Sequence, residues 1–78
     1  QLQMFINGIS TLTATERIIF DLYIEGNSTK DVLAKLNIKE NTLKFHNKNI
    51  YAKLGVSSRK QLLYYATLKN NEKERSEK

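Results

Sequence analysis

Apolar side chains recur along most of the chain three and four positions apart, which is the spacing of one face of an α-helix. Alternation of β-branched and polar residues is rare, and the chain contains no proline to interrupt a helix. The pattern therefore predicts an all-α fold. A length of 78 residues suits one small domain, which we expect to be a compact four-helix domain.

Polar residues at helix ends divide this pattern into separate helices. Thr13 followed by Glu16 forms a capping box, so the first helix is expected to start at Thr13 and to end at Gly26. The second helix is expected to start at Ser28, with Asp31 in its first turn. Asn37 tolerates the left-handed conformation that ends such a helix, and the next residue then packs inward.

Two further helices follow. The third is expected over about 41–54 and ends at Gly55, and the fourth starts at Ser58, which forms a second capping box with Gln61. The turn between the second and third helices is short, and the helix after it is basic. This arrangement is typical of a helix-turn-helix, here over about 29–48, although many small helical proteins contain such a pair.

The flanks of this region differ in composition. Residues 1–11 are mildly apolar and are expected to be a linker or a short N-terminal extension, which is compatible with an extra helix. Residues 69–78 are almost wholly polar and are expected to form a C-terminal tail, either a fraying helix end or disordered. The folded domain is therefore predicted to span residues 12–68.

Positive charge is concentrated in one part of the chain. The formal net charge is +5, and residues 39–60 hold six basic side chains against the single acid Glu40. Such a basic stretch is typical of a surface that binds a polyanion such as DNA. A solvated lysine face that keeps the domain in solution explains the charge equally well.

The third helix has two different faces when its residues are placed at 100° intervals. One face is a predicted core stripe made of Leu43, His46, Ile50 and Leu54. The opposite face presents Asn41, Lys44, Phe45, Lys48, Tyr51 and Ala52. Lysines can donate to guanine acceptors, Asn41 can pair with an adenine edge or a phosphate, and a phenyl ring can pack on thymine methyl groups. Alternatively, Phe45 packs under residues 1–12 or is a tolerated surface aromatic.

Catalytic and metal chemistry find little support in the sequence. The chain has no cysteine and a single histidine, His46, which on the core stripe is expected to be a packed residue rather than a ligand. Glu16 and Asp31 are explained as first-turn capping residues. We therefore expect no enzyme activity, catalytic residue, cofactor or metal. The longest apolar run, residues 62–66, is too short to span a membrane, so no membrane contact is expected.

Four motifs, in order and without a gap, resemble the LuxR-type (GerE-type) DNA-binding domain. They are "LTxxE" at 12–16, Gly26, "TLKxH" at 42–46 and "KLGVxSR" at 53–59. The resemblance implies a bacterial, cytoplasmic transcription regulator in which the third helix lies in the major groove of double-stranded DNA. It also implies that the chain is the C-terminal effector domain of a longer regulator, of the kind found in response regulators. The missing N-terminal portion would then carry a sensing function.

The resemblance also suggests roles for individual residues. The expected base contacts are Lys44, Phe45, Lys48 and Asn41. The expected phosphate contacts are Lys30, Thr29, Lys39, Thr42, Tyr51 and Arg59. The fourth helix often mediates dimerisation in the family, and the expected contacts of a homodimer on paired half-sites are Leu63, Tyr64 and Thr67. RNA polymerase is a further candidate partner.

Some positions depart from the family pattern. Relatives usually have Ser or Thr where Lys39 stands, and a lysine cannot accept the capping hydrogen bond. We therefore expect Asn41 or Glu40 to cap the third helix instead. Position 47, often basic or apolar in relatives, is Asn, and position 37, often Gly, is also Asn.

Two alternative functions remain open from the sequence. One is the promoter-reading helix-turn-helix of a sigma factor, although an arginine-rich segment is expected there in place of residues 46–61 and no fourth helix. The other is a helical protein-interaction module without DNA binding, docking through Phe45, Tyr51 and the Tyr64–Tyr65 pair. Salt dependence distinguishes this module from a DNA-binding domain, since DNA binding releases counterions and weakens steeply with salt.

Overall fold

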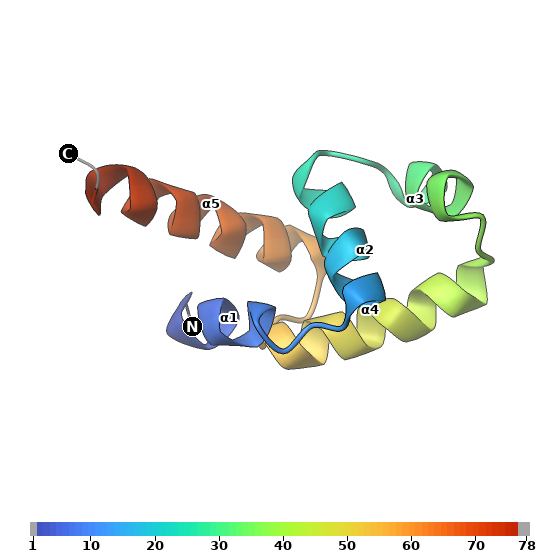
Figure 1. The fold of residues 1–78 in the computed structure, drawn as a ribbon, viewed down its shortest axis with the longest axis horizontal. Coiled ribbons are helices and arrows are strands. Elements are labelled where there is room, and N and C mark those ends of the chain that lie inside the picture. Colours follow the sequence, from blue (N-terminus) through green and yellow to red (C-terminus); the bar gives the residue numbers. More distant parts are fainter. Residues whose placement is uncertain (1, 77–78) are drawn as a thin grey trace.

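Five helices make up the computed structural model, which describes residues 2–76 and the side chains of residues 2–70. They are α1 (Leu2–Ile9), α2 (Ala14–Ile24), α3 (Thr29–Leu36), α4 (Glu40–Leu54) and α5 (Arg59–Ser76). The all-α prediction is confirmed, with one helix more than the four expected. The molecule is elongated, with extents of 42 × 21 × 20 Å. In Figure 1, α3 and the start of α4 form one end, while α1 and the far part of α5 form the other.

Local capping explains where α2 and α3 begin and end. The side chains of Thr13 and Ser28 each accept a hydrogen bond from the backbone amide three residues on. The residues at those positions are Glu16 and Asp31, and their carboxylates accept in turn from the backbone amides of Thr13 and Ser28. Asn37 then ends α3 in the left-handed conformation, with φ of 53°. These boundaries are those that the sequence predicted.

The start of α4 differs from the prediction. The cap residue is Lys39, and no side chain accepts a hydrogen bond from the first turn of the helix. The expectation that Asn41 or Glu40 would act as the cap is therefore wrong. Glu40 and Asn41 are the first two residues of the helix itself, whereas the cap position before it is occupied by Lys39, whose side chain has no acceptor. The first-turn amides of α4 are consequently left for water or a ligand.

The start of α5 is only partly as predicted. The backbone amide of Gln61 donates to Ser58 Oγ at 3.2 Å, as a capping box requires. The Gln61 side chain, however, accepts from the amide of Ser57 at 2.8 Å rather than from Ser58. The reciprocal bond has moved one residue back, and it fixes the turn that leads out of α4.

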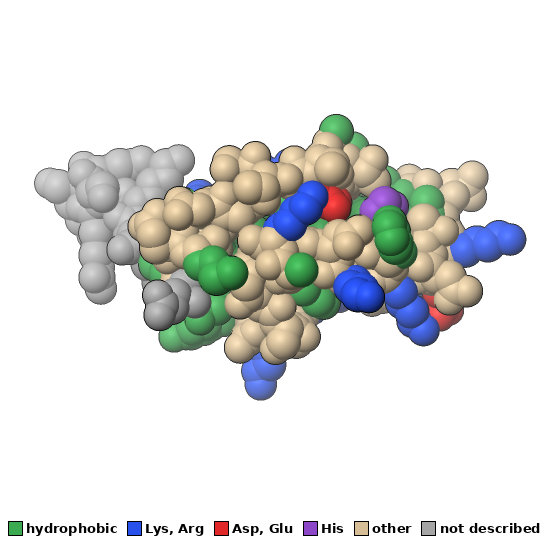
Figure 2. Space-filling model, turned by 90° about the horizontal axis from the view of Figure 1, so that it is seen from below, with side chains coloured by type: hydrophobic (Ala, Val, Ile, Leu, Met, Phe, Trp, Pro, Cys, Tyr) green, Lys and Arg blue, Asp and Glu red, His purple; other side chains and the backbone are tan. Residues whose placement is uncertain are grey.

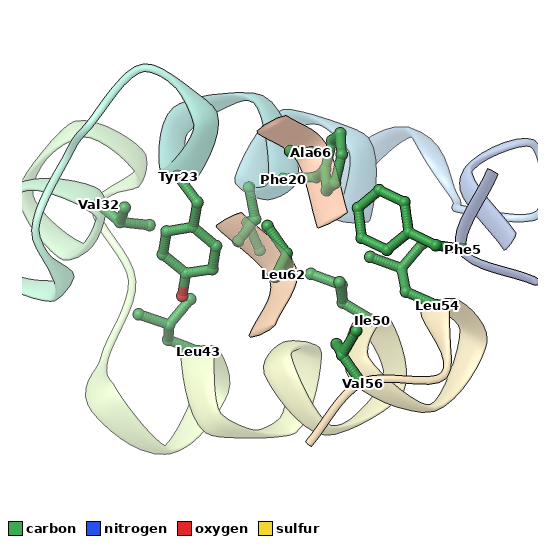
Figure 3. Close-up of a cluster of buried hydrophobic side chains, with 11 residues drawn as sticks. Phe5, Phe20, Tyr23, Val32, Leu43, Ile50, Leu54, Val56, Leu62 and Ala66 are labelled. Atoms are coloured by element: carbon green, nitrogen blue, oxygen red, sulfur yellow. The ribbon is translucent and has the colours of Figure 1, made fainter. Parts of the chain in front are cut away.

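The core is one continuous cluster that runs along the molecule. Its buried apolar side chains are Phe5, Ile19, Phe20, Tyr23, Val32, Leu43, Ile50, Leu54, Val56, Leu62 and Ala66. Figure 3 shows Tyr23 beside Leu43 and Val32 at one end and Phe5 beside Leu54 at the other. Every helix contributes to this cluster, but α3 supplies only one fully buried side chain, Val32.

Residues 2–9 form a helix that is packed into the domain. Phe5 is completely buried, and its ring lies 6.1 Å from the Phe20 ring and 5.6 Å from the Tyr65 ring. Gly8 faces the end of α4, where a Cβ atom would lie only 2.1 Å from the carbonyl oxygen of Lys53. The absence of a side chain at Gly8 therefore allows α1 to pack directly against the α4 backbone.

The polar C-terminal region is helical as far as it is described. The backbone of α5 continues through Ser76. Residues 77–78 of the predicted tail lie outside the described residues, as do the side chains of residues 71–76.

Gly8→Ala is expected to lower the free energy of unfolding by about 1–3 kcal/mol, because the added methyl group would overlap the Lys53 carbonyl oxygen. At an uncrowded position in a helix, the same change raises stability by up to about 1 kcal/mol, so the sign of the change is diagnostic. Urea unfolding followed by circular dichroism measures it. Asn7→Ala, at the neighbouring exposed position of α1, is the matched control and should change the value by less than about 0.5 kcal/mol. A more stable Gly8→Ala variant would contradict the close packing of α1 on α4.

Candidate nucleic-acid interface

The outward face of α4 combines positive charge with an exposed aromatic ring. Asn41, Lys44 and Lys48 are exposed, and 63% of Phe45 is accessible to solvent. Figure 2 views the molecule from below, along the side that α4 lines in Figure 1, and shows Lys and Arg side chains interspersed with hydrophobic ones. The alternative in which residues 1–12 cover Phe45 is wrong, since those residues leave the ring in solvent. Among the described residues, this arrangement leaves most of the Phe45 ring exposed between cations.

The inward face of α4 anchors the helix. Leu43, Ile50 and Leu54 are buried, as the core stripe predicted. His46 was expected on the same stripe but is only half-buried, and its ring meets the Phe45 ring edge-on at 5.7 Å between centroids. The histidine therefore lies at the margin of the core, where it supports one side of the exposed phenylalanine.

A polar network around Tyr23 joins four helices behind this face. The Tyr23 hydroxyl donates to Asn47 Oδ1 on α4 at 2.6 Å. The Arg59 guanidinium from α5 lies over the Tyr23 ring, 4.2 Å from its centroid, and donates to Thr29 Oγ1 at 2.8 Å. We call Tyr23, Asn47, Arg59 and Thr29 the Tyr23 network.

The predicted phosphate-contact residues fall into two groups. Lys30 is exposed in the first turn of α3, and Lys39 and Thr42 are exposed at the start of α4. Thr29 and Arg59, by contrast, are bonded to each other within the Tyr23 network. Of these five residues, the structure thus gives two, Thr29 and Arg59, an internal partner.

Tyr51 is half-buried and packs against the core. Burial, together with the nearby Tyr23 phenol, raises the pKa of the Tyr51 phenol above its ordinary value, although the Arg59 charge acts in the opposite direction. Because the ordinary value is already about 10, the hydroxyl is protonated at neutral pH. Tyr51 can therefore donate a hydrogen bond to an anionic acceptor.

A buried ion pair holds the other end of α4. Glu16 is 4% exposed, and its carboxylate accepts from Lys53 Nζ at 2.6 Å and from the Thr13 amide at 2.9 Å. Burial by itself raises the pKa of the Glu16 carboxyl, but the hydrogen bonds from Lys53 and Thr13 and the Lys53 charge together bring the pKa below its ordinary value. Glu16 is thus both a capping residue and the partner of a lysine at the far end of α4.

Sequence reasoning missed both the ion pair and the role of Asn47. Lys53 was counted with the surplus positive charge, although on the helical wheel it falls at about 180° from Lys44, beside the core stripe. That position indicated a lysine turned away from the basic face. Asn47 lies between the two faces of the wheel, so its pairing with Tyr23 had no comparable signal.

The predicted dimerisation residues lie on α5. Tyr64 is 60% exposed and Thr67 is exposed, with its hydroxyl bonded to the Leu63 carbonyl oxygen at 3.0 Å. Leu63 is partly buried against the core of its own domain. Tyr64 and Thr67 are therefore the two whose side chains are available to a partner.

The described residues offer neither a membrane-spanning helix nor a cluster of metal ligands. No helix among them is long and apolar enough to cross a membrane. Within the same residues, no group of three or more His, Cys, Asp or Glu side chains is placed to hold a metal ion.

Comparison with known proteins relates this sequence to bacterial regulators. Residues 10–66 match the model of a family described as bacterial regulatory proteins, luxR family. A Mycobacterium tuberculosis protein named as an HTH-type transcriptional regulator is 43% identical over 56 residues, which cover 72% of this chain and 6% of that protein. The spore germination protein GerE of Bacillus subtilis is 40% identical over 50 residues, which cover 64% of this chain and 68% of GerE.

A further relative is the transcriptional regulatory protein MctR of Rhizobium johnstonii. It is 37% identical over 59 residues, which cover 76% of this chain and 28% of MctR. The chain spans only a small part of the first relatives found, 6% of their length. No solved structure matches the chain significantly.

Glu16→Gln is expected to lower the free energy of unfolding at pH 7 by about 1–3 kcal/mol, because it removes the charge that Lys53 pairs with. Since the folded-state pKa of Glu16 is lowered, the wild-type advantage is complete above the unfolded value of about 4.3 and is lost as pH falls through the folded value. Urea unfolding from pH 7 to pH 2 measures this convergence.

Glu25→Gln is the matched control, because Glu25 is an exposed glutamate at the end of the same helix. The substitution should change the free energy of unfolding by no more than about 0.5 kcal/mol at every pH. Parallel curves for wild type and Glu16→Gln across this pH range would show that the ionised form of the carboxylate contributes no stability.

Proposed function

The chain belongs to the LuxR family of bacterial regulatory proteins, and we propose that it is a sequence-specific DNA-binding domain that inserts α4 into the major groove. Membership confirms the resemblance drawn from the four sequence motifs and places the chain with regulators rather than enzymes. The observation that carries the proposal is Phe45, which is 63% exposed and lies between two exposed lysines on the face of α4 opposite the core.

Each group on this face has a use in a DNA groove. Lys44 and Lys48 supply attraction to the phosphates and can donate to the O6 and N7 acceptors of guanine. Phe45 has no polar atoms, so its contribution is contact with thymine methyl groups and base edges. Asn41, in the first turn, can pair with an adenine edge. Lysines of this kind draw the domain to DNA in general, while the ring and the amide favour particular bases.

The surrounding residues fit contacts with the DNA backbone. Lys39 and Thr42 are exposed at the start of α4, and Lys30 is exposed in the first turn of α3. The first-turn amides of α4 have no side-chain cap, so they are available to a phosphate oxygen. Tyr51 can donate its hydroxyl, and Arg59 with Thr29 forms the margin of the same surface. We propose that these contacts fix the register in which α4 enters the groove.

We further propose that two copies bind paired half-sites through α5. Tyr64 and Thr67 are exposed on that helix, and Leu63 lies beside them. Residues 12–68 form the proposed DNA-binding unit, with α1 packed against it. As part of a bacterial transcription regulator it would act at promoters in the cytoplasm, where RNA polymerase is the natural partner.

Lys44→Ala and Lys48→Ala are each expected to weaken binding to a selected duplex by about 1–3 kcal/mol and to leave helicity unchanged. The selected duplex comes from enrichment of bound sequences from a random pool, in which paired half-sites would report binding as a dimer. Gel-shift titration over a salt series then measures affinity and its dependence on salt.

Arg17→Ala is the control for loss of one positive charge, because Arg17 lies on α2 and pairs with Asp21 at the surface. Affinity that is unaffected by both lysine substitutions would contradict the groove assignment. Binding that hardly changes with salt would favour the protein-interaction module instead, since apolar docking releases few ions.

Phe45→Ala is expected to reduce sequence preference more than general affinity. Because the ring carries no charge, its loss should weaken binding to the selected duplex several-fold while leaving binding to random duplex nearly unchanged. Competition titration of both duplexes against the same labelled probe measures the ratio. Equal losses on the two duplexes would show that Phe45 contributes to affinity without contributing to choice of sequence.

A further inference from the structure

We infer that the Tyr23 network is a positioning device for sequence recognition, which sets the placement of α4 relative to α3. The inference rests on the proposed DNA-binding function. Neither Tyr23 nor Asn47 is among the residues expected to contact DNA, so the role assigned to them is to hold the contacting residues in register.

The first part of the network reaches α4 from behind. Tyr23 is 1% exposed, so its hydroxyl needs a partner within the protein or bound water. Figure 3 shows the Tyr23 ring crossing the core from α2 with its hydroxyl toward the Leu43 side of α4. The partner is Asn47 Oδ1 at 2.6 Å. Asn47 is in the same stretch of α4 as Lys44 and Lys48, so this bond fixes the part of the helix that is proposed to read bases.

The second part of the network reaches α3. The Arg59 guanidinium stacks on the Tyr23 ring and donates to Thr29 Oγ1, and it also lies 3.4 Å from the Asn27 carbonyl oxygen. These bonds hold the first turn of α3 and the loop before it. The Tyr23 side chain thus holds the middle of α4 through Asn47 and the start of α3 through Arg59.

These contacts matter for the position of α3, because few other contacts hold that helix in the domain. Val32 is its only fully buried side chain, and its other large apolar residues, Leu33 and Leu36, are only partly buried. The backbone link to α4 is the short turn at 37–39. Since α3 makes few apolar contacts, its position in the domain depends largely on its polar contacts.

The consequence for recognition is geometric. Lys30 near the start of α3 and Lys39 and Thr42 near the start of α4 are proposed to meet phosphates, while Lys44, Phe45 and Lys48 are proposed to meet bases. Base contacts form only if the phosphate contacts place α4 at the right depth and angle. Binding to random duplex does not require that register. Loosening the network should therefore lower specific binding and leave random binding unchanged.

Tyr23→Phe removes the single hydroxyl that bonds to Asn47 and keeps the buried ring under Arg59. The ratio of affinities for the selected and random duplexes should fall about three- to tenfold, as expected for the loss of one hydrogen bond. The salt dependence and the affinity for random duplex should stay at wild-type values. Tyr65→Phe is the matched control, because Tyr65 packs beside Phe5 at the other end of the core. It should leave the ratio unchanged.

A double-mutant cycle separates positioning from general loss of stability. Asn47→Ala should reduce the ratio by a similar factor, and the Tyr23→Phe/Asn47→Ala double variant should show no further loss. Circular dichroism melting identifies the temperature at which all variants are folded, and the titrations are made there. Additive losses, or equal losses on selected and random duplexes, would overturn the inference.

The two proposals fail in different ways. A wild-type domain that enriches no sequence from the random pool would overturn the DNA-binding function and the inference together. A wild-type domain that enriches a sequence, with a Tyr23→Phe variant that keeps the full affinity ratio, would overturn the inference alone.

Discussion

The buried carboxylate of Glu16 is the constraint on which the arrangement of this domain depends. A carboxylate that is 4% exposed must be paired and hydrogen-bonded, because an unpaired buried charge costs several kcal/mol. Here the Thr13 amide and the Lys53 ammonium meet that need at 2.9 and 2.6 Å. The pair links the start of α2 to the last turn of α4. Gly8 of α1 then packs on the carbonyl oxygen of the same lysine, so three helices meet at one point.

The C-terminal end and the middle of α4 are consequently held by different chemistry. The Glu16–Lys53 ion pair secures its C-terminal end, and the Tyr23–Asn47 hydrogen bond secures its middle. Leu43, Ile50 and Leu54 supply the apolar contact between these points. With its inward side satisfied in this way, the helix turns Lys44, Lys48 and Phe45 outward. The exposed ring is thus an unfavourable feature of the isolated domain, and the proposed binding to a DNA groove would cover it.

Much of the fold could be predicted from the sequence because its signals are local. The capping residues Thr13 and Ser28 accept hydrogen bonds from amides three positions away. Asn37 and Gly55 end their helices through the left-handed conformation of their own backbone. Local rules were less successful at helix starts where more than one residue could make the capping hydrogen bond. Lys39 begins α4 without a side-chain cap, and the Gln61 side chain bonds to Ser57 instead of Ser58. Neither outcome follows from residue type alone.

The sequence by itself determined the four helices that follow residue 12, the two faces of α4 and the family, since each depends on spacing within a few residues or on short motifs. Only the tertiary structure decided which polar side chains meet. Tyr23 and Asn47 are 24 residues apart, Thr29 and Arg59 are 30 apart, and Glu16 and Lys53 are 37 apart. Such partners are brought together by helix packing, which depends on the whole core at once. For that reason Lys53, one of six basic residues in its stretch of sequence, pairs with the buried Glu16 carboxylate and lies apart from the surface proposed to bind DNA.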